Sequence, residues 1–210
     1  MRLSVKEDGN WRSFRHRNYR ILFPANAVSN IGSWAQRIAQ DWLVLELTNN
    51  NGTYLGLVTA VQFAPVLFFS LHGGKLADRF NKRKVLILTN IIGGASSLAL
   101  GVLVMTDLVA LWHVFVLAGI LGISTAIDAP VRQSFTTEVV GQTDLPNAVS
   151  LNSANFNAGR LVGPAISGGL IAAFGTGPSF IVNGLSYLFV IAALMNLNEK
   201  AFFYQDRPKS

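Results

Sequence analysis

The sequence predicts an all-α polytopic membrane protein with six transmembrane helices. Half of its 210 residues are hydrophobic and only 13% are charged, a balance that lipid-facing surface tolerates and water-facing surface does not. Long apolar segments recur along the chain, each near the roughly 20 residues that cross about 30 Å of hydrocarbon. The 19 glycines suit close packing between such helices.

We expect six spans flanked by two segments outside the hydrocarbon. Residues 1–19 are predicted to be a basic cytoplasmic segment at the membrane interface, because Trp11, Phe14 and Tyr19 stand among arginines. Residues 198–210 would be a cytoplasmic tail or the start of a central linker. The spans are expected at 20–46, 53–76, 84–106, 109–132, 147–174 and 178–197.

The basic residues predict how these spans are oriented. Lys and Arg in short loops are retained on the cytoplasmic side. Of the 17 Lys and Arg residues, all but two lie before span one, between spans two and three, at the end of span four or after span six. Both termini are therefore predicted to be cytoplasmic, in a multi-pass protein of the cell (inner) membrane. The net charge of +6 then reflects topology and anionic lipid, with no sequence signature of nucleic-acid binding.

The first span is the most polar, and its polar side chains recur with a helical period. Because an ionised group in hydrocarbon costs several kcal/mol, this stripe should face either a water-filled cavity or another helix. The two readings are equally open for Asn26 and Ser33, whereas the cavity is favoured for Arg37. Asp41, one turn later, is the expected partner of Arg37. The stripe contains Asn26, Ser29, Asn30, Ser33, Gln36, Arg37, Gln40 and Asp41.

The fifth span carries the other intramembrane cation, Arg160. Asn157 falls on the same side of the helix. Arg160 is expected near the midplane of the bilayer, where transporters bind substrates and ions. The alternative is that Arg160 forms a purely structural salt bridge. The predicted substrate or ion pathway is Asn26, Asn30, Ser33, Arg37, Asp41, Asn157 and Arg160.

Small residues in the same span predict close helix packing, and a proline predicts a bend. The predicted packing motif is Gly159, Gly163, Pro164 and Gly168. Similar rows in other spans, such as Gly56, Ala60 and Ala64 in span two, also predict packing surfaces.

No catalytic set is present in the sequence. Cysteine is absent, the HExxH and GxSxG patterns are missing, and the three histidines are scattered. We therefore expect no enzyme activity, no cofactor and no metal site.

The charged turn between spans two and three predicts a cytoplasmic gate. Asp78 can pair with Arg79 and Arg83, and Asp128 at the end of span four can join them. A competing interpretation is that these charges only anchor topology, but positive-inside orientation requires neither aspartate. The predicted gate residues are Gly74, Asp78, Arg79, Arg83, Asp128 and Arg132.

These motifs resemble those of the major facilitator superfamily (MFS). The turn Gly74-x-Leu76-Ala77-Asp78-Arg79-x-x-Lys82-Arg83 is similar to the superfamily signature between helices two and three, with Asn81 where glycine is usual. Gly159-x3-Gly163-Pro164-x3-Gly168 is similar to its fifth-helix antiporter motif, with Ser167 replacing a glycine.

Within the superfamily, the chain resembles bacterial exporters that include enterobactin efflux proteins. The resemblance extends from about Phe14 to Leu197 and rests on Ile31-Gly32-Ser33-Trp34-x-Gln36-Arg37, Asp128-x-Pro130-x-Arg132-Gln133 and Leu145-Pro146-Asn147-Ala148-x-x-Leu151-Asn152-Ser153.

The resemblance implies one six-helix half of the MFS fold, a 3+3 inverted repeat. It also implies alternating-access export of a siderophore- or drug-like small molecule across the lipid bilayer, coupled to protons. Superfamily transporters hold substrate between two halves, so a second six-helix half is expected: a missing carboxy-terminal half, a partner subunit or an identical copy. The alternative is a non-transporting assembly or regulatory subunit, or an inactive truncated half-transporter.

Overall fold

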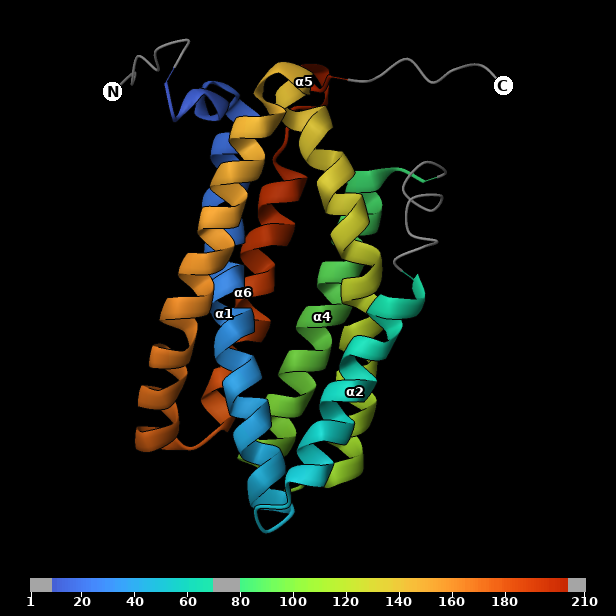
Figure 1. The fold of residues 1–210 in the computed structure, drawn as a ribbon, viewed down its shortest axis with the longest axis vertical. Coiled ribbons are helices and arrows are strands. Elements are labelled where there is room, and N and C mark those ends of the chain that lie inside the picture. The colour runs from blue at the N-terminus through green and yellow to red at the C-terminus, as the bar shows by residue number, and fades with distance from the viewer. Residues whose placement is uncertain (1–8, 70–79, 204–210) are drawn as a thin grey trace.

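The computed structural model describes residues 9–69 and 80–203, and within these ranges the chain is helical without any strand. The helices are α1 (Arg17–Leu47), α2 (Gly52–Phe69), α4 (Lys82–Met105), α5 (Leu111–Phe174) and α6 (Gly177–Met195), as Figure 1 shows. Short 3-10 helices lie at Arg12–Arg15 and Glu199–Ala201. The all-α class expected from the sequence is confirmed.

The apolar character of the helices suits a bilayer. Among the described residues, α4, α5 and α6 are long and apolar enough to cross a membrane, and α2 is a shorter apolar helix. Large side chains such as Leu161 and Phe174 are 79% and 74% exposed, as lipid-facing residues would be.

Helix α5 consists of two rods that meet at Gly141. This glycine has φ 72° and ψ 171°, a backbone conformation that residues with a Cβ rarely adopt. The first rod continues well past residue 132, where the sequence suggested that span four ends. Figure 1 shows the two rods, yellow and then orange, running away from this turn on different sides of the bundle.

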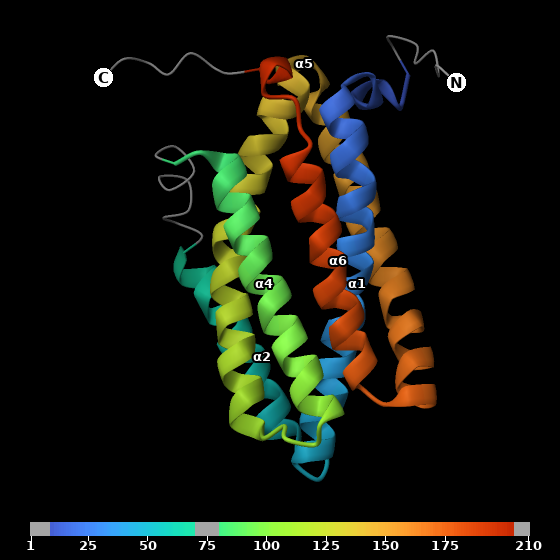
Figure 2. The ribbon, with the colours of Figure 1, turned by 180° about the vertical axis from the view of Figure 1, so that it is seen from behind.

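Glycines set the closest approaches between the helices. A Cβ on Gly163 would lie 2.6 Å from the Cβ of Trp34 and 2.8 Å from the carbonyl oxygen of Ile31, so the second rod of α5 touches the backbone of α1. A Cβ on Gly122 would lie 2.2 Å from the carbonyl oxygen of Gln62, so the first rod is equally close to α2. Helix α6 packs against both α1 and α4, as Figure 2 shows from behind.

The predicted small-residue surfaces are not all used within the described chain. Gly159 approaches the backbone of Asn30 in the same way as Gly163 approaches Ile31, and Pro164 lies half-buried beside them. In contrast, nothing lies within 4 Å of a Cβ built on Gly168 or Gly56. These two glycines therefore face outward and do not contribute to packing between the described helices.

The described segment before α1 is bonded to the turn between the two rods of α5. Asp144, whose side chain is 1% exposed, accepts from Arg15 Nε at 2.7 Å and bonds His16 Nε2 at 2.6 Å. Ser13 donates to Asn147 Oδ1 from both its backbone N–H and its hydroxyl. We call Ser13, Arg15, His16, Asp144 and Asn147 the terminal clasp.

The described segment after α6 reaches the same region. The side chain of Asn18 exchanges two hydrogen bonds, each 2.9 Å long, with the backbone of Asn198, and the backbone N–H of Phe203 donates to the carbonyl of Glu138. Tyr19 is only 3% exposed and packs in a protein core, so it does not lie at the lipid interface as its position in the sequence suggested. Both described ends therefore lie on one side of the bundle.

The clasp also sets the protonation of its central carboxylate. Burial alone would raise the pKa of Asp144, but the hydrogen bond from His16, the charge and hydrogen bond of Arg15 and the charge of His16 together hold this pKa below its ordinary value. The carboxylate therefore favours the folded state at pH values above about 4, the pKa of an unperturbed Asp.

Substituting Gly163 by Ala is predicted to destabilise the protein by about 1–3 kcal/mol, because the new methyl group meets the backbone of α1. The matched control, Gly168→Ala, places its methyl group in open space and should be neutral or stabilising by up to about 1 kcal/mol through helix propensity. Thermal unfolding of both variants in detergent measures the difference. Equal melting temperatures would show that α1 and α5 are not in this close contact.

Substituting Asp144 by Asn is predicted to lower stability at pH 7 by about 1–2 kcal/mol, since Arg15 is partly solvent-screened at 42% exposure. The difference in stability between the wild type and Asp144→Asn should shrink as the pH falls through the lowered pKa of Asp144. Protonation then removes the negative charge that the substitution also removes. Melting temperatures at pH 7 and pH 3 test this. Glu199→Gln, which alters the exposed pair with Arg83, is the control and should change little. If Asp144→Asn lowered the melting temperature equally at both pH values, the negative charge of Asp144 would contribute nothing to stability.

Candidate functional site

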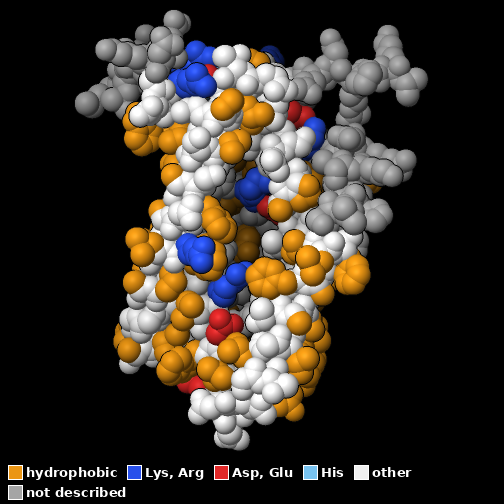
Figure 3. Space-filling view, viewed as in Figure 1, with side chains coloured by type: hydrophobic (Ala, Val, Ile, Leu, Met, Phe, Trp, Pro, Cys, Tyr) orange, Lys and Arg blue, Asp and Glu red, His pale blue; other side chains and the backbone are white. Residues whose placement is uncertain are grey.

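A polar cavity of about 490 Å³ lies among all five α-helices of the described chain. Figure 3 shows this face of the molecule hollowed at its centre, with basic and acidic side chains gathered around the hollow. Of the pathway residues predicted from the sequence, the cavity is lined by Asn26, Asn30, Ser33 and Arg37. These residues of the polar stripe of α1 thus face an open space bounded by helices. Of the two environments expected from the sequence, the cavity describes them better than contact with a neighbouring helix alone.

The other three predicted pathway residues do not line this cavity. Asp41 is half-buried on α1. Asn157 is exposed and donates to the carbonyl of Ser153 in its own helix, at 2.8 Å. Arg160 is exposed as well, and its guanidinium carbon lies 5.7 Å from the ring centre of Trp34, a cavity-lining residue.

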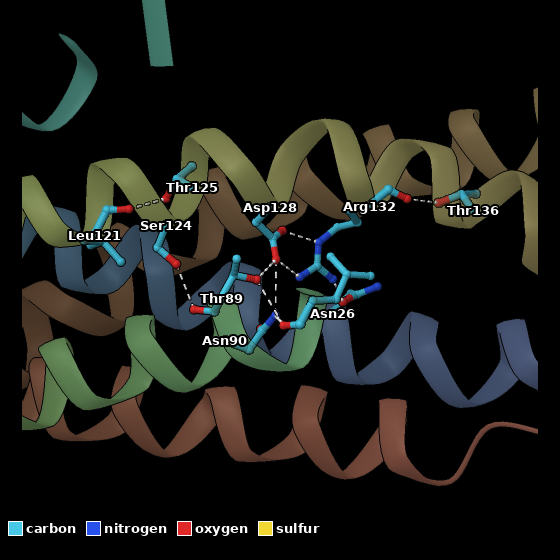
Figure 4. A network of polar contacts seen from close by, with 10 residues as sticks. Asn26, Thr89, Asn90, Leu121, Ser124, Thr125, Asp128, Arg132 and Thr136 are labelled. Carbon is cyan, nitrogen blue, oxygen red and sulfur yellow. Dashed lines mark hydrogen bonds and ion pairs between the residues drawn. The ribbon is translucent and has the colours of Figure 1, made fainter. Parts of the chain in front are cut away.

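The centre of the site is an ion pair within α5. Arg132 donates from Nε to Asp128 Oδ2 at 2.7 Å and from Nη2 to Asp128 Oδ1 at 3.0 Å, a two-point contact across one helical turn. Figure 4 shows the pair facing α4 and α1, from which three further side chains converge on it. Both charged residues line the cavity.

Those three side chains complete the bonding of the pair. Thr89 and Asn90 of α4 donate to Asp128 Oδ1 at 2.8 and 3.2 Å, and Asn26 of α1 accepts from Arg132 Nη1 at 2.6 Å. The hydrogen bond from Asn90 joins α4 to α5. Two opposite charges that pair with each other and are hydrogen-bonded by neighbouring side chains can persist inside an apolar bundle, where an unpaired charge is costly.

A second buried network joins α1, α4 and α6. Asn183 and Ser97 both donate to the side-chain oxygen of Gln36, and Ser186 donates to Asn183. Sequence reasoning placed Ser97 in a small-residue packing row and did not select Asn183, although an amide near the middle of the apolar sixth span is a signal that could have found it. Gln40 similarly donates to Gln62 at 3.0 Å, which links α1 to α2 beside the cavity.

Arg37 is held by aromatic rings. Its guanidinium carbon lies 4.9 Å from the ring centre of Trp34 on its own helix and 4.8 Å from that of Phe63 on α2. Such contacts stabilise a cation without consuming its N–H groups. Among the described residues, Arg37 forms no ion pair with Asp41, the partner expected from the sequence.

The predicted gate is only partly within the described residues. Gly74, Asp78 and Arg79 lie outside them. Among the described gate residues, Asp128 pairs with Arg132, whereas Arg83 donates to the carbonyls of Leu194 and Met195 and pairs with Glu199. The last carbonyls of α6 have no partner within their helix, so a guanidinium at that point satisfies them.

A second ion pair connects α4 to α5 at the same end of the bundle. Lys82 Nζ lies 2.6 Å from Glu138 Oε1, and both side chains are largely buried. Together with Arg83, it anchors the start of α4 to α5 and α6. No cluster of three or more residues able to hold a metal ion is found in ranges 9–69 and 80–203.

Comparison with known proteins identifies relatives across nearly the whole chain. A family model described as "Transmembrane secretion effector" matches residues 8–205. The chain is 26% identical to the staphyloferrin A transporter of Staphylococcus aureus, over 86% of this chain and 46% of that protein. It is 31% identical to the multidrug efflux pump Tap of Mycolicibacterium fortuitum, over 74% of this chain and 39% of the pump.

A solved structure shares the fold. The crystal structure of an auto-inhibited peptide transporter of the POT family superposes with a TM-score of 0.76 at 19% sequence identity, covering 92% of this chain and 39% of that one. This likeness concerns the fold alone. The chain spans less than half the length of these curated relatives and of the solved transporter.

Proposed function

We propose, because this chain belongs to the transmembrane secretion effector family of the major facilitator superfamily, that it is one six-helix half of a small-molecule exporter. The chain is a membrane protein and not an enzyme, as expected from the sequence. One observation carries the proposal of a transport path: the cavity of about 490 Å³ that polar side chains line inside an otherwise apolar bundle.

Such a cavity has a cost that packing alone does not explain. Amides, hydroxyls and two arginines gathered around an open space would destabilise a bundle in lipid unless water or a ligand contacts them. In a transporter, the same groups bind the substrate during its passage. A siderophore- or drug-like molecule agrees with the names of the relatives, which include a siderophore transporter and a multidrug pump.

A transport path through this cavity requires a second set of helices to enclose it. The relatives are more than twice as long as the matched region, and the small residues Gly56 and Gly168 face outward from the described bundle. A second six-helix half would cover these surfaces and close the cavity; its source is a carboxy-terminal half, a partner subunit or an identical copy. We place the assembly in the cell (inner) membrane with both termini cytoplasmic, because basic residues in short loops are retained on the cytoplasmic side.

Alternating access then needs a gate and a coupling site. We assign the gate to the segment that contains Gly74, Asp78 and Arg79 and precedes Arg83 in the sequence. Asp128 is the carboxylate best placed for proton coupling, because it lines the cavity and forms an ion pair with Arg132. Asp41 is the second candidate.

Substituting Asp128 by Asn is predicted to lower efflux at least about tenfold, because loss of one full charge leaves Arg132 without its counter-ion. The measurement is efflux of a fluorescent substrate from cells that produce the chain together with its second half. Glu46→Gln is the matched control, since Glu46 is exposed and bonds only Trp42 of its own helix.

Undiminished efflux in Asp128→Asn, at equal protein levels in the membrane, would contradict the coupling role. Efflux by the purified chain alone in liposomes would identify the second half as an identical copy. Absence of efflux with every source of a second half would favour the alternative, a non-transporting assembly or regulatory subunit.

Substituting Asp78 by Asn is predicted to shift the cavity between inward- and outward-open states, because the gate loses its central charge. The chain has no cysteine, so Ser33→Cys introduces a single thiol at the cavity wall. Labelling of this thiol by a membrane-impermeant reagent from each side measures the shift. Identical two-sided labelling with and without the Asp78→Asn substitution would rule out a gating role for this carboxylate.

A further inference from the structure

We propose that the cavity binds organic anions, with the acidic group of the ligand held at Arg37 and its apolar part on the neighbouring aromatic rings. This inference rests on the proposed transport function and names the substrate class of the same cavity. It follows from a comparison of the charged groups that are already paired with those that are not.

The paired charges are those of Asp128 and Arg132. Asp128 Oδ1 accepts from Thr89, Asn90 and Arg132, and Oδ2 accepts from Arg132 Nε. Arg132 uses its third nitrogen on Asn26. Neither member of this pair offers a free full charge to a ligand, and Asp128 is the one carboxylate that lines the cavity within the described chain.

Arg37 is the remaining charge on the cavity wall. Within the described residues, its guanidinium has two aromatic contacts, at 4.9 Å to Trp34 and 4.8 Å to Phe63, and no hydrogen-bond acceptor or ion pair. Asp41 lies one helical turn away on the same helix. Its N–H donors are therefore available in a fixed position between two helices, and a guanidinium fork matches a carboxylate in two-point contact.

A second cation stands close by on α5. The guanidinium carbon of Arg160 lies 5.7 Å from the ring centre of Trp34, so one indole has an arginine from α1 and another from α5 beside it. Two like charges near one ring repel each other, and an anion bound next to Trp34 would relieve that repulsion.

The aromatic residues supply the surface for the rest of the ligand. Phe156 meets Trp34 edge to face at 5.5 Å, and Phe63 closes the other side of Arg37. A ligand with a carboxylate and a flat or apolar body would contact donors and rings together. A cationic ligand would find the same rings occupied by arginines and the lining carboxylate already bonded.

The test uses two fluorescent probes of opposite charge, 5-carboxyfluorescein and ethidium, with the purified full chain in an uncharged detergent. Fluorescence anisotropy gives the Kd of each probe. We expect 5-carboxyfluorescein to bind more tightly than ethidium, and its affinity to fall as salt is raised. Arg37→Gln should raise its Kd about tenfold or more, and Arg37→Lys, which keeps the charge, should raise it less.

Two further variants keep the result interpretable. Lys200→Gln removes an exposed cation distant in sequence from the cavity lining and should leave the Kd unchanged, which separates the site from general basicity. Arg160→Gln alters an exposed side chain and should weaken the anion several-fold, even if Arg37→Gln fails to fold as judged by its size-exclusion profile.

Tighter binding of ethidium, an unchanged 5-carboxyfluorescein Kd in both arginine-to-glutamine variants, or no binding of either probe would each overturn the inference. The efflux assay separates it from the transport proposal. Efflux of ethidium but not of 5-carboxyfluorescein would leave transport standing and the anion class wrong. Arginine-dependent binding of 5-carboxyfluorescein without efflux would leave the anion class standing and transport wrong.

Discussion

The ion pair between Asp128 and Arg132 is the interaction around which the polar interior is arranged. Charges inside an apolar bundle persist only when protein groups replace the water they have lost. Here α4 supplies Thr89 and Asn90, and α1 supplies Asn26. The pair therefore ties three helices together at the wall of the cavity. It is also a place where a change of charge would be felt by all three helices, which is what a coupling site requires.

The close approach of backbones complements this polar centre. Gly163 and Gly122 bring the two rods of α5 against α1 and α2, so that the polar stripe of α1 is presented to a space bounded by five helices and not to lipid. The turn at Gly141 makes this possible, because it lets one helix contribute to both sides of the bundle. Packing and polarity thus depend on each other: the glycines position the helices, and the side chains between them determine what the cavity can bind.

The end of the bundle that carries both described termini is organised differently. It has a fully buried carboxylate, Asp144, surrounded by basic groups from a segment more than a hundred residues earlier in the chain. Arg83 and Lys82 anchor the start of α4 nearby. Specific bonds therefore hold the described segments before α1 and after α6, and the start of α4, against the rest of the bundle.

The sequence by itself determined the helical class, the membrane setting, the family likeness and the polar stripe of α1, because each depends on composition, local motifs or the 3.6-residue period. Asn26, Asn30, Ser33 and Arg37 were found in this way. Only the tertiary structure decided the partners that charged groups have on other helices: Arg83 on α6, Arg132 on Asn26, and Asp144 on Arg15 and His16. A period shows which face of a helix a residue occupies, whereas its partners come from helices distant in the sequence, whose positions depend on how all the helices pack together.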